Sequence, residues 1–384
     1  MRRRQLLKAG GALCASFGAT RAWSQAMVDY AAPPRFARPD IASDEGGLWA
    51  LMDREEKAVR RSPLLLRDEK LTSYVQQVAC RLGGDHCPDI RVFLVRTPLF
   101  NASMAPNGMM QVWSGLLLRM ENEAQLAAIL GHEIAHFLQR HSVERLRDIK
   151  GRAAAGQVLG FFGLVGLIGQ IAIAAGGYGY SRDHEREADS ISLALMQRAG
   201  YDVAEASKVW TNLIEESTAA GDETGGATLF ATHPASTERR DTLAEMARSI
   251  SGGRSEPDGY RAHIGPFLDE WLRDEVKRGQ YAQSIALFSR QIAAGIEPGL
   301  VRYYRGEAYR LRGQNGDHEL ALADYQTAAK ASRPQPAVHR GMGLIYRQRG
   351  QREEAVRAFG RYLDLAPDSP DADFIRSYVT ELSA

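Results

Sequence analysis

The chain has 384 residues, of which 44% are apolar, enough for about two ordinary domains with cores of their own. Its 48 basic and 47 acidic residues nearly cancel. Such a balance lacks the basic excess that nucleic-acid binding needs, so we expect no nucleic-acid partner.

Residues 1–26 are typical of an export signal, with a basic start, an apolar stretch and a small residue, Ala26, before the expected cut. Arg3-Arg4-Gln5-Leu6-Leu7-Lys8 resembles a twin-arginine signal in which Leu6 replaces the usual Phe. Removal of this segment takes away five basic residues and leaves 43 against 47 acidic ones, a net charge of −4. We therefore expect a released, mildly acidic periplasmic protein, exported by the twin-arginine or the general secretory route.

Helical spacing extends over residues 44–82, and the β-branched alternation from Asp89 to Thr97 predicts a strand. Between them, Cys80 and Cys87 are close enough in sequence to close a small disulfide loop in an oxidising compartment. Met109 to Ser114, which follows a turn-rich segment, predicts a second strand.

A strong helix follows Asn122, an N-cap residue with Gln125 three positions later. On this helix His132 and His136 stand four residues apart in His132-Glu133-Ile134-Ala135-His136, so both imidazoles project from one face and can share a metal ion. Two histidines need a third protein ligand, with one position left for water. His141, five residues beyond His136, is off this face, and we expect it to be a surface histidine.

A second strong helix is predicted over residues 183–200, and it places Glu185 and Asp189 on one face. Glu185 is the expected third ligand, and Asp189 is expected to accept the spare N–H of a ligand histidine, with His132 the favoured partner. One zinc ion per chain would then activate water, with Glu133 as general base. The alternative is a solvated charged face shared with Arg182 and Arg186. We expect His184 to lie at the surface.

Residues 158–179 are nearly all apolar and long enough for a membrane span. One crossing would put His136 and Glu185 on opposite sides of a bilayer, so we expect a hairpin or loop over the cleft instead. Such a lid could touch a membrane surface or an unfolded client, and simple core packing is an equal alternative.

Further helices are predicted over 204–218 and 236–250, followed by a glycine-rich linker at Ser251 to Gly265. The C-terminal part repeats at the tetratricopeptide spacing, in which small residues let helices approach and aromatic residues fill the gap. The matching residues are Gly306, Tyr309, Ala321, Tyr325 and Pro334, and then Gly343, Tyr346, Ala355, Phe359 and Pro367. A degenerate first repeat is expected near 268–298.

Several of these motifs together resemble the zinc peptidases that include HtpX and the CAAX prenyl proteases, and most closely their periplasmic, BepA-type members. The resemblance covers about 44–250 and rests on the HExxH motif and on Asn101 to Pro106, Ser114 to Leu117, Ser181 to Asp189, Thr232-His233-Pro234 and Arg239. It implies an α+β fold, with a mostly helical zincin (gluzincin-type) domain at 27–250 and a small β-sheet. After the linker at 251–265, an α-helical tetratricopeptide-repeat array would occupy 266–384.

The resemblance also implies that the strand from Met109 to Ser114 is the edge along which an extended substrate lies. The expected substrate-binding residues are Asn101, Ala102, Met109, Met110, Gln111, Val112 and Trp113. An unpaired edge offers main-chain hydrogen bonds to any peptide. The alternative is an ordinary core strand.

His233 has three interpretations. In the family the loop histidine can approach the zinc and hold the enzyme latent; otherwise His233 stabilises the oxyanion, or it only helps to start a helix. Arg239 is grouped with the catalytic residues, either steadying this loop or binding substrate carbonyls.

The sequence thus predicts an envelope zinc endopeptidase acting on unfolded or misassembled proteins. The resemblance adds possible contact with the outer-membrane assembly machinery through the repeats. A non-enzymatic or latent chaperone is the alternative.

Overall fold

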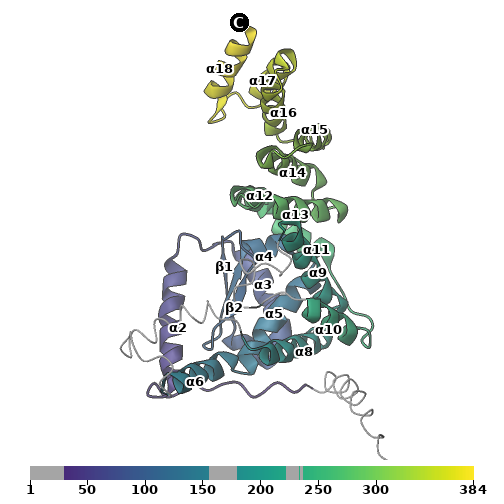
Figure 1. Cartoon of the computed structure of the whole chain (residues 1–384). Helices are drawn as coiled ribbons and strands as arrows, with labels where there is room; N and C mark the ends of the chain where they lie inside the picture. Colours follow the sequence, from purple (N-terminus) through teal and green to yellow (C-terminus); the bar gives the residue numbers. More distant parts are fainter. Residues whose placement is uncertain (1–29, 155–179, 222–232, 234–236) are drawn as a thin grey trace, which may run out of the picture.

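The computed structural model describes residues 30–154, 180–221, 233 and 237–384, and in it a globular N-terminal part carries a column of C-terminal helices (Figure 1). The expected export signal at 1–26 and the apolar stretch 158–179 lie outside the described residues. No helix of the described part is both long and apolar enough to cross a membrane.

The globular part is mostly helical with one small sheet, which confirms the predicted α+β class. Its elements are α2 (Asp44–Arg61), α3 (Glu69–Gly83), the 3-10 helix η1 (Gly84–Asp89), β1 (Arg91–Val95), β2 (Ala102–Met104), β3 (Met109–Trp113), α4 (Ser114–Arg119), α5 (Glu123–Leu138), α6 (His141–Ala154), α8 (Arg182–Arg198), α9 (Ala204–Ala219) and α10 (Thr237–Ala247). The two helices that carry the metal-binding motifs each begin at a side-chain cap. Asn122 accepts a hydrogen bond from the Gln125 N–H at 2.9 Å, and Ser181 accepts one from the His184 N–H at 3.1 Å.

The sheet has the strand order β1-β3-β2, which corrects the expected edge strand. β3 pairs with β1 in parallel and with β2 in antiparallel orientation, so the backbone of Met109 to Trp113 is already paired on both sides. Both β1 and β2 lie at edges of the sheet, but the outer side of β1 is partly occupied, because the Leu66 N–H donates to the Leu94 carbonyl oxygen at 2.9 Å. Within the described residues no strand pairs with the outer side of β2, which the sequence did not predict. Substrate therefore cannot add to β3, and the core-strand alternative describes it correctly.

The expected disulfide between Cys80 and Cys87 is present and ties the end of α3 to η1. His86, between these residues in sequence, is buried and its Nε2 lies 2.8 Å from the Pro33 carbonyl oxygen. Its ring also contacts Phe36 and Phe137. His86 is therefore a core residue.

The segment expected as a linker is partly helical. It contains α11 (Pro257–Ile264), whose Tyr260 is completely buried and donates a hydrogen bond to the Leu117 carbonyl oxygen at 2.6 Å. The connection is therefore packed against the globular part, although its glycines predicted an open linker.

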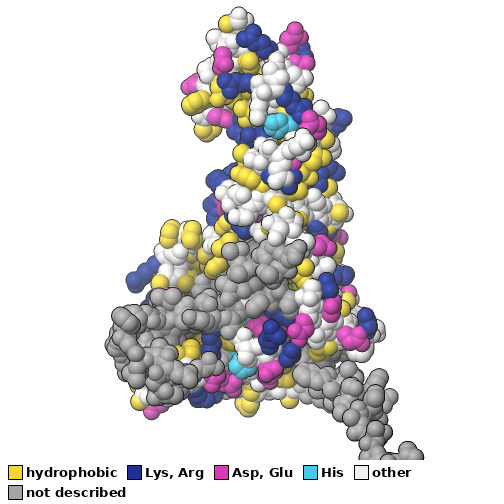
Figure 2. All heavy atoms as spheres, in the orientation of Figure 1, with side chains coloured by type: hydrophobic (Ala, Val, Ile, Leu, Met, Phe, Trp, Pro, Cys, Tyr) yellow, Lys and Arg dark blue, Asp and Glu magenta, His cyan; other side chains and the backbone are white. Residues whose placement is uncertain are grey.

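Helix pairs stack beyond this connection as η2 (Gly265–Phe267), α12 (Leu268–Lys277), α13 (Tyr281–Ala293), α14 (Pro298–Arg312), α15 (Asp317–Ala328), α16 (Ala337–Gln348), α17 (Arg352–Leu365) and α18 (Ala372–Ser383). Cβ atoms added to Gly306 and Gly341 would lie 2.7 and 2.5 Å from the Tyr325 ring. The missing side chains thus make room for the aromatic ring, the packing expected from the spacing. On the face that Figure 2 shows, acidic and basic side chains are interspersed over the described part of this column.

A buried ion cluster joins the column to the globular part. Arg119 on α4 donates to Glu216 on α9 at 2.8 Å and to Glu275 on α12 at 3.0 Å, and all three side chains are fully buried. Arg290 and Arg278 supply the remaining positive charge, at 2.7 Å from Glu216 and 2.6 Å from Glu275. Each carboxylate is thus paired twice, as buried charges require.

Replacing Arg119 with Met should lower the free energy of unfolding by about 3–5 kcal/mol, because two carboxylates lose a buried partner. Urea unfolding would measure the change. The matched control is Arg357→Met on α17, whose side chain is 67% exposed and which should change stability by less than about 0.5 kcal/mol. Equal effects of the two substitutions would contradict this interpretation of the cluster.

Candidate metal centre

Helices α5 and α8 approach each other closely at Gly131. A Cβ atom on Gly131 would lie only 2.8 Å from Ser192 Oγ, and that hydroxyl donates a hydrogen bond to the Ala128 carbonyl oxygen at 2.8 Å. Because the helices pack so closely that Gly131 has no room for a side chain, other side chains of α5 and α8 can reach one common point.

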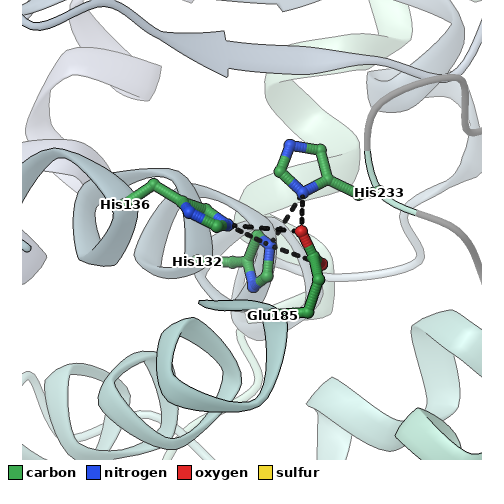
Figure 3. A group of neighbouring side chains, drawn as sticks. All are labelled: His132, His136, Glu185 and His233. Carbon is green, nitrogen blue, oxygen red and sulfur yellow. Dashed lines mark hydrogen bonds and ion pairs between the residues drawn. The ribbon is translucent and has the colours of Figure 1, made fainter. Parts of the chain in front are cut away.

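His132 and His136 on α5, Glu185 on α8 and His233 point their polar atoms toward one centre (Figure 3). The Nε2 atoms of His132 and His136 are 3.1 Å apart. They lie 3.4 and 3.6 Å from the Glu185 carboxylate oxygens. His233 Nδ1 lies 2.8 Å from Glu185 Oε1 and 3.2 Å from His132 Nε2.

These separations fit a divalent cation. Zinc with bonds near 2.1 Å in tetrahedral geometry has ligand atoms about 3.4 Å apart. The donor set of imidazole nitrogens and a carboxylate oxygen also suits zinc. The geometry thus brings together the three ligands expected from the sequence and adds His233 at the fourth corner.

Asp189 and Arg239 contact the ligand side chains on the side away from the common centre. Asp189 Oδ1 lies 3.0 Å from His132 Nδ1, so it can accept the N–H of the ring nitrogen that faces away from the centre. Arg239 donates twice to Asp189, at 2.8 and 2.7 Å, and lies 2.7 Å from Glu185 Oε2. Its guanidinium also stacks 4.0 Å from the ring centre of Trp210. Arg239, expected among the catalytic residues, is therefore placed to orient the carboxylates.

Electrostatics favour anionic carboxylates here. Burial favours the neutral form of Glu185, but His233 and His132 outweigh it and hold the pKa of Glu185 far below its usual value. Burial likewise opposes ionisation of Asp189, yet Arg239 and His132 lower its pKa. For His132, burial lowers the pKa, but Asp189 and Glu185 raise it to about 9. The site attracts positive charge, which a cation would supply.

Glu133 lies beside the cluster and against the sheet. Burial raises its pKa above the usual value, while His233 and His132 partly oppose the shift. The nearby backbone of Met104 in β2 also lowers this pKa slightly, and Glu133 Oε1 lies 3.5 Å from His233 Nε2. The base expected from the sequence thus faces both the metal centre and the free strand.

His141 is not at the surface, contrary to expectation. It is 1% exposed, and its Nδ1 lies 2.8 Å from His136 Nδ1. The expectation assumed that α5 continues, but α5 ends at Leu138 and Arg140 has a φ of +58°. This left-handed residue turns the chain so that α6 begins beside His136. His184, by contrast, is partly exposed.

Two residues that contact the side chains of the metal centre were not predicted from the sequence. The Tyr180 ring stacks on His136 with centroids 4.0 Å apart, and its hydroxyl lies 2.9 Å from Ser142 Oγ. Tyr180 directly precedes Ser181, the N-cap of α8, and this position could have indicated that its side chain lies near Glu185. Trp210, beneath Arg239, comes from the distant α9, and no local pattern marks it.

An HExxH helix, a carboxylate from a neighbouring helix and an adjacent buried glutamate beside a free strand edge define a metallopeptidase of the zincin type. Residues 65–247 match the profile of peptidase family M48, so this part of the chain is an M48 metallopeptidase domain. The enzyme is a metal-dependent endopeptidase.

The chain is 25% identical to the beta-barrel assembly-enhancing protease of Escherichia coli (strain K12), over 84% of this chain and 76% of that protein. It is 34% identical to the mitochondrial metalloendopeptidase OMA1 of Schizosaccharomyces pombe, over 49% of this chain and 57% of that protein. The Arabidopsis thaliana OMA1 is 30% identical over 44% of this chain and 36% of that protein. The similarity to the bacterial protease thus covers much more of the chain.

Asp189→Asn should weaken metal binding by about 10–100-fold, because the carboxylate that orients His132 is lost. Competition with a chromophoric chelator would measure the affinity. Asp183→Asn is the matched control on the same helix, since the Asp183 side chain is 90% exposed, and it should leave the affinity unchanged. Unchanged affinity in Asp189→Asn would mean that Asp189 does not support the ligand.

Proposed function

We propose that the chain is a zinc-dependent endopeptidase of the cell envelope that cleaves misfolded or stalled envelope and outer-membrane proteins. The convergence of His132, His136 and Glu185 next to Glu133 carries the peptidase part. The export pattern at 1–26 supports a periplasmic location. The similarity to a relative named for enhancing β-barrel assembly supports the substrate class.

Zinc held by these residues would polarise a water molecule and the carbonyl group of the scissile peptide. Glu133 takes the proton of that water and passes it to the leaving amine. Its burial and its raised pKa suit a group that both accepts and returns a proton. Asp189 and Arg239 keep His132 and Glu185 in place during the reaction.

The substrate lies along the free side of β2. Asn101 O accepts from Trp113 N–H and Ala105 N–H donates to Met109 O, so the alternate residues Ala102 and Met104 point their backbone groups away from β3. The backbone of Met104 is near enough to Glu133 to lower the pKa of its carboxyl group. A peptide paired with Ala102 and Met104 would therefore pass directly in front of the base.

His233 keeps the enzyme latent in this proposal. Its Nδ1 completes the cluster at the corner where water would bind, and its Nε2 lies 3.5 Å from Glu133 Oε1. One side chain thus fills the space in front of both the metal position and the base. Withdrawal of His233 by a substrate or partner would open both together.

The stacked helices α12–α18 serve in this proposal as tetratricopeptide-type surfaces that bring clients or the outer-membrane assembly machinery to the enzyme. The support is that the similarity to the beta-barrel assembly-enhancing protease covers 84% of this chain and so extends into these helices. The apolar stretch 158–179 is proposed as the element that contacts a client or a membrane surface.

A casein assay on wild type, Glu133→Gln and His233→Ala, with zinc content measured for each, tests the proposal. Glu133→Gln should retain one zinc and lose cleavage, because only the base is removed. His233→Ala should cleave faster, on the order of tenfold, because a competing imidazole leaves the water position. His339→Ala on α16 is the matched control and should behave as wild type.

A large loss of cleavage in His233→Ala with zinc retained would reject latency and favour oxyanion stabilisation. If neither wild type nor His233→Ala cleaves casein, the non-enzymatic chaperone is favoured. Wild type that binds no metal would remove the basis of the proposal.

Substrate pairing with β2 predicts an alternating response to backbone methylation of a peptide substrate. Methyl groups on successive amide nitrogens should lower kcat/KM by about 5–10-fold at every second position near the cleavage site, since one hydrogen bond of about 1 kcal/mol is lost there. Intervening positions point to solvent and should respond little. A uniform response along the peptide would contradict pairing with a strand.

A further inference from the structure

The buried face of His136 that points away from the metal centre meets another histidine. His136 Nε2 faces His132 and Glu185, and His136 Nδ1 lies 2.8 Å from His141 Nδ1. Two ring nitrogens at this distance require one donor and one acceptor. The proton of this contact therefore decides which nitrogen of His136 carries a free lone pair.

Only one arrangement leaves His136 able to bind a cation through Nε2. His136 must then carry its proton on Nδ1 and donate it to His141 Nδ1. His141 in turn must carry its own proton on Nε2, which lies 3.3 Å from Glu187 Oε2. The carboxylate of Glu187 is an acceptor, so it favours this tautomer of His141.

We propose that His141 is a positioning residue, which sets the tautomer and the ring orientation of His136 through the contact between their Nδ1 atoms, with Glu187 setting the tautomer of His141. This inference rests on the proposed metal binding by His136. It gives the second histidine of the motif the support that Asp189 gives to the first.

A different role for His141 is a second cation site with Glu144 and His184, whose polar atoms also lie close together. The geometry disfavours it. The His141 and His184 rings are stacked at 4.2 Å with an interplanar angle of 16°. Lone pairs in the planes of stacked rings run side by side and do not converge on one ion. His141 Nδ1 is in addition occupied by His136.

The test compares zinc affinity in His141→Leu, His141→Asn and His184→Leu with that of the whole wild-type chain, by chelator competition. His141→Leu removes the acceptor and should weaken binding by about 10–100-fold. His141→Asn places an amide oxygen where Nδ1 stood and should restore affinity to within about threefold of wild type. His184→Leu removes a stacked imidazole that does not contact His136 and is the matched control.

A second readout is the visible absorption of the Co²⁺-loaded protein, which reports ligand geometry without catalysis. The spectrum should change in His141→Leu and stay as in wild type in His141→Asn and His184→Leu. A purely structural role of His141 would not be rescued by the shorter, polar Asn.

Wild-type affinity in His141→Leu, or failure of His141→Asn to restore it, would overturn the inference while leaving the proposed function intact. Two zinc ions per wild-type chain, with one lost in His184→Leu, would assign His141 to the second site instead. Wild type without zinc would overturn the proposed function and this inference together.

Discussion

A cation with bonds of about 2 Å can be shared by two helices only where their backbones come unusually close, and this requirement shapes the whole centre. Gly131 supplies the close approach on α5, and the small Ser192 faces it from α8. The Ser181 cap starts α8 at the place where Glu185, one turn later, turns toward the two histidines. Each ligand therefore depends on helix packing that is fixed elsewhere.

Arg239 compensates part of the negative charge of the centre. Glu185 and Asp189 are both buried, and unpaired buried carboxylates are costly. Arg239 bridges the two, and its aromatic neighbour Trp210 covers the guanidinium. Because the carboxylates are held in this way, the ligand positions are organised in advance, and the binding of a cation requires little rearrangement of these residues.

Local patterns in the sequence carried much of this information. The Asn122 cap, the four-residue spacing of His132 and His136, and the same spacing of Glu185 and Asp189 are properties of single helices. They indicated which side chains share a face, and the remaining step was to pair the two helices.

Features that depend on contacts between distant segments, or on residues without a recognisable local sequence pattern, were not predictable. β2 is three residues long, too short to show an alternating pattern, so the free edge was assigned to Met109–Trp113 instead of to β2. Arg140 adopts a left-handed conformation that sequences usually mark with Gly or Asn, and the turn that buries His141 was therefore missed. Tyr260 lies in a glycine-rich stretch, yet its ring fills a core position.

The ion cluster around Arg119 bears on where the chain could be divided. Its partners Glu216 and Glu275 belong to α9 and α12, and Gln291 of α13 donates to the Leu118 carbonyl oxygen at 2.7 Å. A shortened protein ending near residue 250 would lack Glu275 and Arg290, so Arg119 and Glu216 would each lose a buried partner. It would also expose the apolar surface of α4 to solvent. A recombinant catalytic fragment should therefore retain the chain through α13. Helices α12 and α13 belong structurally to the peptidase domain.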